Sequence, residues 1–161
     1  MKSLLIVWHS RTGGSEAMAR AALEGAVGEA NISLKTAAET IPGDIAAADG
    51  YLFVCPENLA SMSGAMKDFF DRCYYPVLGK IEGRPYASLI CAGSDGEGAA
   101  RQIARIALGW RLKTVAAPLI ICTHAQTPEA INAPKIITAG ELERCRQLGA
   151  AMAAGLVMGI F

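Results

Sequence analysis

A loop of hydroxyl side chains and glycines follows the first apolar run of the chain and could bind a phosphate group. Its hydroxyls belong to Ser10, Thr12 and Ser15, and Gly13 and Gly14 lie among them. The next residues are typical of a helix, so the glycines would let backbone N–H groups gather at a helix N-terminus, where the helix dipole favours an anion. The loop has neither the lysine of a Walker A motif nor the GxGxxG spacing of a dinucleotide site. The same residues could instead form a simple turn with Ser15 as the helix cap, and the pattern alone does not decide between the two.

Two further loops with polar residues and glycines follow later apolar runs. One has the sequence PENLASMSG at 56–64, and the other has the sequence GSDGEG at 93–98. Ligands bind at the carboxyl ends of the strands in open α/β sheets, so we expect all three loops to meet at one edge of a sheet. Asp95 and Glu97 are expected to be rim residues and not catalysts, since exposed acidic side chains are common. They are not expected to form a calcium site, because the further oxygen ligands that calcium requires are missing.

The hydrophobic pattern predicts the elements that position these loops. Strands covered on both faces appear as near-continuous apolar runs, and the candidates are 3–9, 50–55, 86–92 and 114–122, with a weaker one at 32–37. The helix candidates between and after them are 15–30, 63–74, 98–110 and 139–155. This alternation predicts an α/β fold, a three-layer sandwich in which a five-stranded parallel sheet has helices on both faces.

Composition restricts the class of protein further. The chain has 161 residues, of which 52% are hydrophobic, and its 15 basic and 15 acidic residues cancel. We therefore expect a single domain over 1–161 without affinity for nucleic acid or an anionic membrane surface. The five cysteines form no CxxC pair and the first apolar run is too short for a signal peptide, which predicts a cytoplasmic protein. His9 and His124 have no clear third ligand, so no metal site is expected.

Three segments of the chain resemble flavodoxin-like proteins. Residues 10–15 resemble the flavodoxin phosphate loop, (Thr/Ser)-x-(Thr/Ser)-Gly-x-(Thr/Ser), which wraps the phosphate of FMN. Residues 48–72 are similar to NAD(P)H-dependent FMN reductases and to quinone reductases related to the tryptophan-repressor-binding protein. In these families a strand ends in proline before a loop that borders the isoalloxazine ring, and a Ser-Gly-x-(Met/Leu)-Lys helix start follows. Residues 83–99 are similar to their next strand and its glycine-rich flavin loop.

The segment after Pro56 departs from part of this pattern. Residues 57–61 read ENLAS, which is closer to the Glu-Tyr-Asn of the FMN reductases than to the Thr-Arg-Phe-Gly-Asn of the quinone reductases. The arginine and the aromatic residue of the quinone reductases are absent. The resemblance therefore leaves the identity of the electron acceptor open.

The resemblance implies an FMN-binding oxidoreductase that passes a hydride from NAD(P)H through the flavin to FMN or a quinone-like acceptor. The alternatives are a non-enzymatic electron carrier of the flavodoxin type and a flavin-free interaction domain. Flavodoxins are usually strongly acidic, so the neutral charge favours the enzyme. No side chain is expected to act as a catalytic acid or base, because the flavin carries the chemistry. The cofactor-binding residues that the resemblance implies are Ser10, Arg11, Thr12, Gly13, Gly14, Ser15, Pro56, Glu57, Asn58, Leu59, Ala60, Ser61, Met62, Gly93, Ser94, Asp95, Gly96 and Gly98.

The C-terminal run suggests a contact between two copies of the chain. Residues 148–161 carry no charge over fourteen positions, and large apolar surfaces usually mark interfaces. The resemblance also favours a homodimer in which the flavin lies near the neighbouring subunit. The alternative is a tail that packs against the edge of its own sheet.

Overall fold

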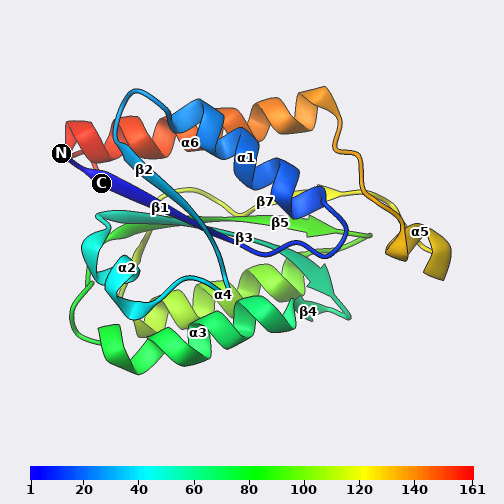
Figure 1. The fold of residues 1–161 in the computed structure, drawn as a ribbon, viewed down its shortest axis with the longest axis horizontal. Helices are drawn as coiled ribbons and strands as arrows, with labels where there is room; N and C mark the ends of the chain where they lie inside the picture. Colours follow the sequence, from blue (N-terminus) through cyan, green and yellow to red (C-terminus); the bar gives the residue numbers. More distant parts are fainter.

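The computed structural model describes residues 1–161 and places one sheet between two layers of helices (Figure 1). The strands are β1 (Ser3–Trp8), β2 (Asn31–Thr36), β3 (Gly50–Asn58), β4 (Ser61–Met62), β5 (Pro85–Ala92), β6 (Lys113–Thr114) and β7 (Leu119–Cys122). The main sheet has the order β2-β1-β3-β5, with β6 and β7 both beside β5, and all of these pairings are parallel. This confirms the three-layer α/β class that the alternating apolar runs predict.

The outermost strand position is divided between two short strands. The strand β6 pairs with the first residues of β5, and β7 pairs with its last four residues. The segment between them ends at Pro118, which has no N–H group to donate to a ladder. The expectation of one continuous strand over 114–122 was therefore wrong, although five strand positions remain.

Helices cover both faces of the sheet. On one face lie α1 (Gly14–Ala26) and α6 (Ala139–Met158), and on the other lie α2 (Pro42–Ala47), α3 (Gly64–Val77) and α4 (Glu97–Gly109) (Figure 1). The short α5 (Pro128–Asn132) projects beyond the edge of the sheet at which β1 and β3 end. Both α2 and α5 were missed, because six and five residues are too few to display a helical period. No helix of the chain combines the length and apolar character needed to cross a membrane.

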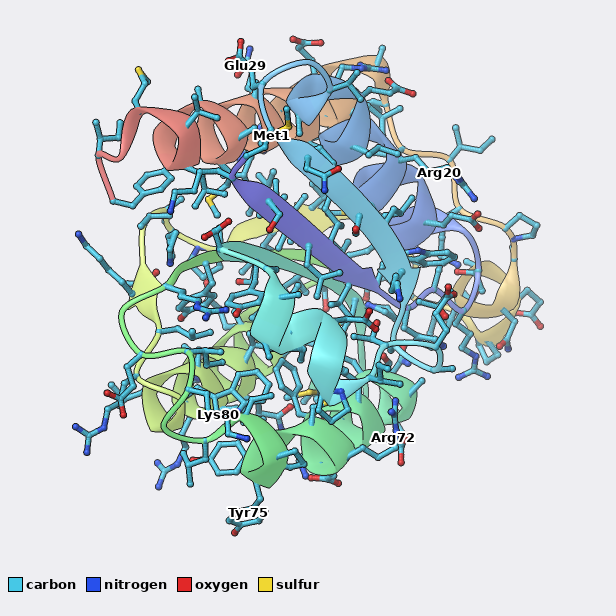
Figure 2. All side chains as sticks on the ribbon, turned by 60° about the vertical axis from the view of Figure 1, so that its left-hand side comes forward. Met1, Arg20, Glu29, Arg72, Tyr75 and Lys80 are labelled. Carbon is cyan, nitrogen blue, oxygen red and sulfur yellow. The ribbon has the colours of Figure 1, made fainter.

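Each face of the sheet has its own hydrophobic core. Leu4 and Ile6 pack toward α1 and α6, whereas Leu5 and Val7 pack toward α3 and α4, as the period of two along a strand requires. An aromatic group around Phe53 and Trp110 fills the second core. Figure 2 shows side chains filling the space between the layers, while Tyr75 projects outward. Burial on both faces explains why the strands are almost continuously apolar.

The helices α1 and α6 lie side by side and touch through their backbones (Figure 1). A Cβ atom added to Gly149 would lie 2.0 Å from the carbonyl oxygen of Ala22, and one added to Gly25 would lie 2.0 Å from that of Arg146. Any side chain beyond hydrogen at either position would force the helices apart. The crossing of α1 and α6 therefore depends on these two glycines.

Much of the uncharged C-terminal run packs against its own chain. Met152, Ala153 and Leu156 are buried in the core under α6. Val157, Met158 and Ile160 remain exposed at the end of the run. Association of two chains stays a prediction, and these exposed side chains are the part of the run left to support it.

Candidate functional site

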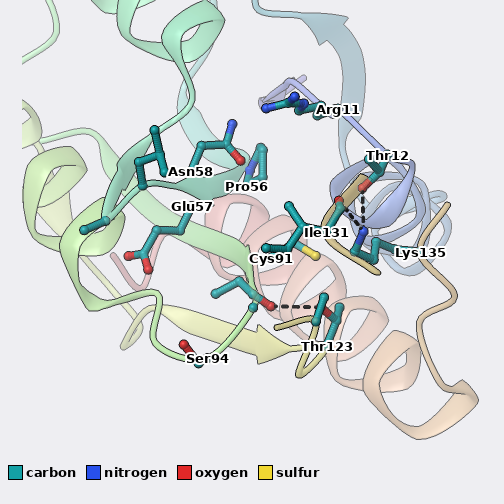
Figure 3. Close-up of a pocket in the computed structure, with 15 residues that line it drawn as sticks. Arg11, Thr12, Pro56, Glu57, Asn58, Cys91, Ser94, Thr123, Ile131 and Lys135 are labelled. Carbon is teal, nitrogen blue, oxygen red and sulfur yellow. Dashed lines mark hydrogen bonds between the residues drawn. The ribbon is translucent and has the colours of Figure 1, made fainter. Parts of the chain in front are cut away.

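Three loops meet where β1, β3 and β5 end, and they border a cavity of about 280 Å³ (Figure 3). The strand order reverses between β1 and β3, which is the position where ligands bind in open α/β sheets. Predicted residues that line the cavity are Arg11, Thr12, Pro56, Glu57, Asn58, Leu59, Ala60, Gly93 and Ser94. Further lining residues, for which no role was predicted, are Cys91, Ala92, Thr123, Ala125, Ile131 and Lys135. The segment that follows β7 thus supplies a fourth wall.

The turn between β1 and α1 contains hydrogen-bond donors that have no acceptor in the chain. Gly13, with a φ of 96°, caps α1, and its N–H donates to Ser10 Oγ at 2.9 Å. The N–H groups of Gly14, Ser15 and Glu16 make no hydrogen bond, as expected in the first turn of a helix. Ser15 Oγ is buried and also has no partner, so Ser15 lies inside the helix and is not its cap. Free amides and a buried hydroxyl at a helix N-terminus fit a phosphate group.

The second loop forms a tight hairpin between β3 and β4 at the rim of the cavity. Leu59 and Ala60 occupy its turn with φ values of 51° and 62°, a left-handed geometry that usually selects Asn-Gly. The Leu59 side chain is fully exposed at the tip of this turn. Non-glycine residues with positive φ carry strain and persist where the surrounding structure holds them. The hairpin therefore presents an aliphatic side chain at the mouth of the cavity.

The base of the hairpin is fixed to α4 and does not face the cavity. The Ser61 hydroxyl and the Met62 N–H both donate to Gln102 Oε1, at 3.0 and 2.8 Å. Met62 is also buried in the core. Ser61 and Met62, predicted as cofactor contacts, are thus placed as supports of the loop.

Glu57 connects the second loop to the third. Its carboxylate accepts the Gly96 N–H at 2.9 Å through one oxygen and the Ala99 N–H at 3.1 Å through the other. These amides belong to the N-terminus of α4, where a negative charge is stabilised by the helix dipole. Glu57 also lines the cavity. Its charge is already matched to the end of α4, so it holds two walls of the site together.

The third loop divides between the cavity and the start of α4. Gly93 and Ser94 line the cavity, whereas Asp95 is exposed. Gly96 is buried with a φ of 91° and caps α4, and Gly98 lies in its first turn against the Ala60 carbonyl. Asp95, Gly96 and Gly98, predicted as cofactor contacts, therefore do not line the cavity.

Replacing Gly96 by alanine is expected to lower the free energy of unfolding by about 2 kcal/mol. The new Cβ would combine an unfavourable positive φ with a position 2.5 Å from Ile120 Cγ2. Urea unfolding of the flavin-free protein measures the loss. Gly28→Ala is the matched control, because Gly28 has a φ of 96° and nothing within 4 Å, so only backbone strain of about 1 kcal/mol should remain. Equal losses in the two variants would contradict the Ile120 contact.

The histidine and cysteine near the site have neutral side chains. His9 Nδ1 lies 2.8 Å from Ser63 Oγ, and burial lowers the pKa of His9, which favours the uncharged ring. Cys91 lines the cavity, and burial raises the pKa of its thiol to about 11. No group of three His, Cys, Asp or Glu side chains is placed to hold a metal ion. These residues serve packing and hydrogen bonding.

Lys135, which lies 123 positions after Thr12 in the sequence, contacts the loop over 10–15. Its Nζ donates to Thr12 Oγ1 at 3.3 Å, and its backbone N–H donates to the Thr12 carbonyl at 2.8 Å. Figure 3 shows the Lys135 side chain extending toward Thr12. A single lysine in a stretch without a motif gives no sequence signal for this contact, which only the folded chain creates.

Comparisons with known proteins agree with this architecture. An archaeal flavodoxin superposes with a TM-score of 0.77 at 17% identity, covering 96% of this chain and 98% of that one. The flavodoxin, WrbA-like protein of Agrobacterium tumefaciens gives 0.65 at 20% identity, covering 95% and 96%. Rubredoxin oxygen:oxidoreductase of Desulfovibrio gigas gives 0.78 at 14% identity, covering 99% of this chain and 37% of that one. These likenesses show a flavodoxin-like fold.

Sequence comparison adds the family. A curated flavodoxin of Aquifex aeolicus (strain VF5) is 31% identical over 100 residues, which are 61% of this chain and 54% of the relative, so the match spans about half of that protein. The family model described as NADPH-dependent FMN reductase matches residues 28–126, a stretch that includes the second and third loops. With more than half of its length matched, the chain belongs to the NADPH-dependent FMN reductase family.

Proposed function

We propose that residues 1–161 form one FMN-binding domain that acts as an NAD(P)H-dependent oxidoreductase on FMN or a quinone-like acceptor. Family membership supports a flavoprotein oxidoreductase. The observation that carries the proposal is the cavity at the ends of β1, β3 and β5, beside which the β1–α1 turn offers hydrogen-bond donors without acceptors. A phosphate is the ligand group that such a turn stabilises best.

In this proposal the three loops bind different parts of FMN. The turn over 10–15 binds the phosphate through the Thr12 and Ser15 hydroxyls and the first amides of α1. The loop over 56–62 and the loop over 93–98 border the ring. Glu57 fixes these two loops relative to each other through its two hydrogen bonds to α4. Bound FMN supplies the redox chemistry, accepting a hydride from a nicotinamide and delivering electrons to an acceptor.

The protein's own contribution is position and exclusion of water. Leu59 and Ile131 both line the cavity and are aliphatic, which favours contact with a planar apolar ring over contact with bulk water. Arg11 is exposed at the mouth, where its guanidinium donates to Asn132 Oδ1 at 3.4 Å. That cation is available to the phosphates of an incoming nicotinamide nucleotide.

A second candidate is a flavodoxin-type electron carrier, which the name of the Aquifex relative favours. Steady-state NAD(P)H oxidation by the FMN-loaded protein distinguishes the two, with free FMN at the same concentration as the control. We expect turnover with FMN or a soluble quinone well above that control. Tight FMN binding without turnover would favour the carrier, and absence of FMN binding would contradict both candidates.

A further inference from the structure

The ammonium group of Lys135 is held in a fixed place beside the β1–α1 turn. Its three N–H groups are directed at the carbonyl oxygens of Ala130, Ile131 and Ala133, which lie 2.7–2.8 Å from Nζ, and one of them is shared with Thr12 Oγ1 at 3.3 Å. The backbone hydrogen bond from Lys135 to the Thr12 carbonyl fixes the base of the same side chain. Lys135 is half-buried and lines the cavity. It is therefore positioned far more tightly than a solvated surface lysine.

The charge of Lys135 is not matched by any acid of the chain. None of the ion pairs in the structure includes Lys135, and its four oxygen partners are all neutral. Glu57 is the carboxylate in the cavity lining, and it already accepts two amides of α4. Around Lys135 and Thr12 the unused groups are the first amides of α1 and the buried Ser15 hydroxyl, all of them donors. This combination lacks only an anion.

We propose that Lys135 is the cation that recognises the phosphate of the bound ligand, a role for which the loop over 10–15 contains no lysine. The proposal rests on the proposed function, since the phosphate is that of FMN. Thr12 connects the two groups, because its Oγ1 accepts from Lys135 and its own O–H is then free to donate to a phosphate oxygen. Lys135 thus orients the Thr12 hydroxyl as well as supplying charge.

The same side chain joins the phosphate to the fourth wall of the cavity. The carbonyls that Lys135 holds belong to α5 and the residues just after it, and Ile131 in that segment lines the cavity. An anion beside Lys135 therefore adds a charged partner to a group that also fixes α5. A purely structural lysine would tie α5 to the loop without distinguishing ligands that carry a phosphate from those that lack one.

The test compares FMN with riboflavin, which has the same ring and no phosphate, in Lys135→Met. Flavin fluorescence titration of the flavin-free protein gives both dissociation constants. We expect FMN binding to weaken about ten- to hundredfold, because the variant loses a positive charge beside the phosphate and the orientation of the Thr12 hydroxyl, with riboflavin changed less than threefold. Lys80→Met is the matched control, because Lys80 is exposed at the opposite end of the sheet and its side chain has no hydrogen bond. Lys135→Arg should retain most of the FMN affinity, since it keeps the charge.

Each other outcome has a definite meaning. Equal weakening of FMN and riboflavin would show that Lys135 only fixes α5, and unchanged FMN affinity would also overturn the proposal. If Lys135→Met does not fold, Lys135→Gln removes the charge and keeps a donor for the same comparison. Thermal unfolding with inorganic phosphate separates this inference from the proposed function. A phosphate-dependent rise in melting temperature that Lys135→Met abolishes would support the anion site even in a protein that binds no flavin, and no rise in a wild type without flavin affinity would reject both.

Discussion

The Thr12→Ala, Ser15→Ala double variant is expected to bind FMN about 3–6 kcal/mol more weakly than the wild type. Each substitution removes a hydroxyl that we assign to the phosphate, and a hydrogen bond to a charged group contributes about 1.5–3 kcal/mol. Thr12 borders the cavity and Ser15 lies in the first turn of α1 with its Oγ unpaired. Fluorescence titration with FMN measures the change, and an unchanged affinity would contradict the assignment of the turn to phosphate.

The Ser15→Ala variant alone serves as a control, because it should weaken FMN binding without lowering the stability of the flavin-free protein. Ser15 is 1% exposed and its hydroxyl has no hydrogen-bond partner, and a buried unpaired hydroxyl destabilises a protein. Removing it should leave the flavin-free protein equally stable or raise its free energy of unfolding by up to about 1 kcal/mol. A substitution that stabilises the empty protein and weakens FMN binding identifies a group reserved for the ligand. Loss of stability instead would mean that Ser15 has a structural partner.

Gly149→Ala is expected to lower the free energy of unfolding by about 3–4 kcal/mol, at or above the upper end for overpacking in a core. The added Cβ would meet the backbone oxygen of Ala22 at 2.0 Å, and a backbone group cannot move aside as the end of a flexible side chain can. The helices α1 and α6 must then separate along their contact. Urea unfolding followed by circular dichroism measures the loss.

Gly140→Ala in the same helix is the matched control for that substitution. A Cβ at Gly140 would have nothing within 4 Å, and Gly140 lies in the first turn of α6, so the same chemical change should stabilise the protein by at most about 0.5 kcal/mol through helix propensity. The two variants are thus expected to shift stability in opposite directions. A small or positive effect at Gly149 would show that α1 and α6 can separate at little cost.

The sequence predicts the sheet and the meeting of the loops well, because both depend on patterns that are local in the chain. Runs such as 50–55 are apolar throughout since both faces of β3 are buried, and a strand buried in this way must lie inside the sheet. Once the strands are parallel, their carboxyl ends share one edge, so the cavity position follows from topology. The division of the strand over 114–122 depends on Pro118 and on pairing along β5, which periodicity does not display.

Contacts between distant residues limit what the sequence reveals about the site. Whether a loop residue faces the cavity or supports the loop depends on its partner, as with Ser61 and Gln102, which are 41 positions apart. Lys135 meets Thr12 across 123 positions and belongs to no motif. The two roles of Glu57, at the cavity and at the end of α4, likewise require the folded chain. The resemblance of motifs therefore located the loops, but it could not show which of their residues face the cavity and which support the loops.

The glycine contact between α1 and α6 also limits how the site can change over evolutionary time. The phosphate-type turn leads directly into α1, and Lys135 lies four positions before α6 begins, so the distance between the two follows from how closely the helices approach. Gly25 and Gly149 set how closely the helices approach, and both lie beyond the first turns of their helices. Replacing either glycine during evolution would therefore shift the turn over 10–15 and Lys135 relative to each other. Exposed positions of the same helices, such as Arg20, are free of that constraint.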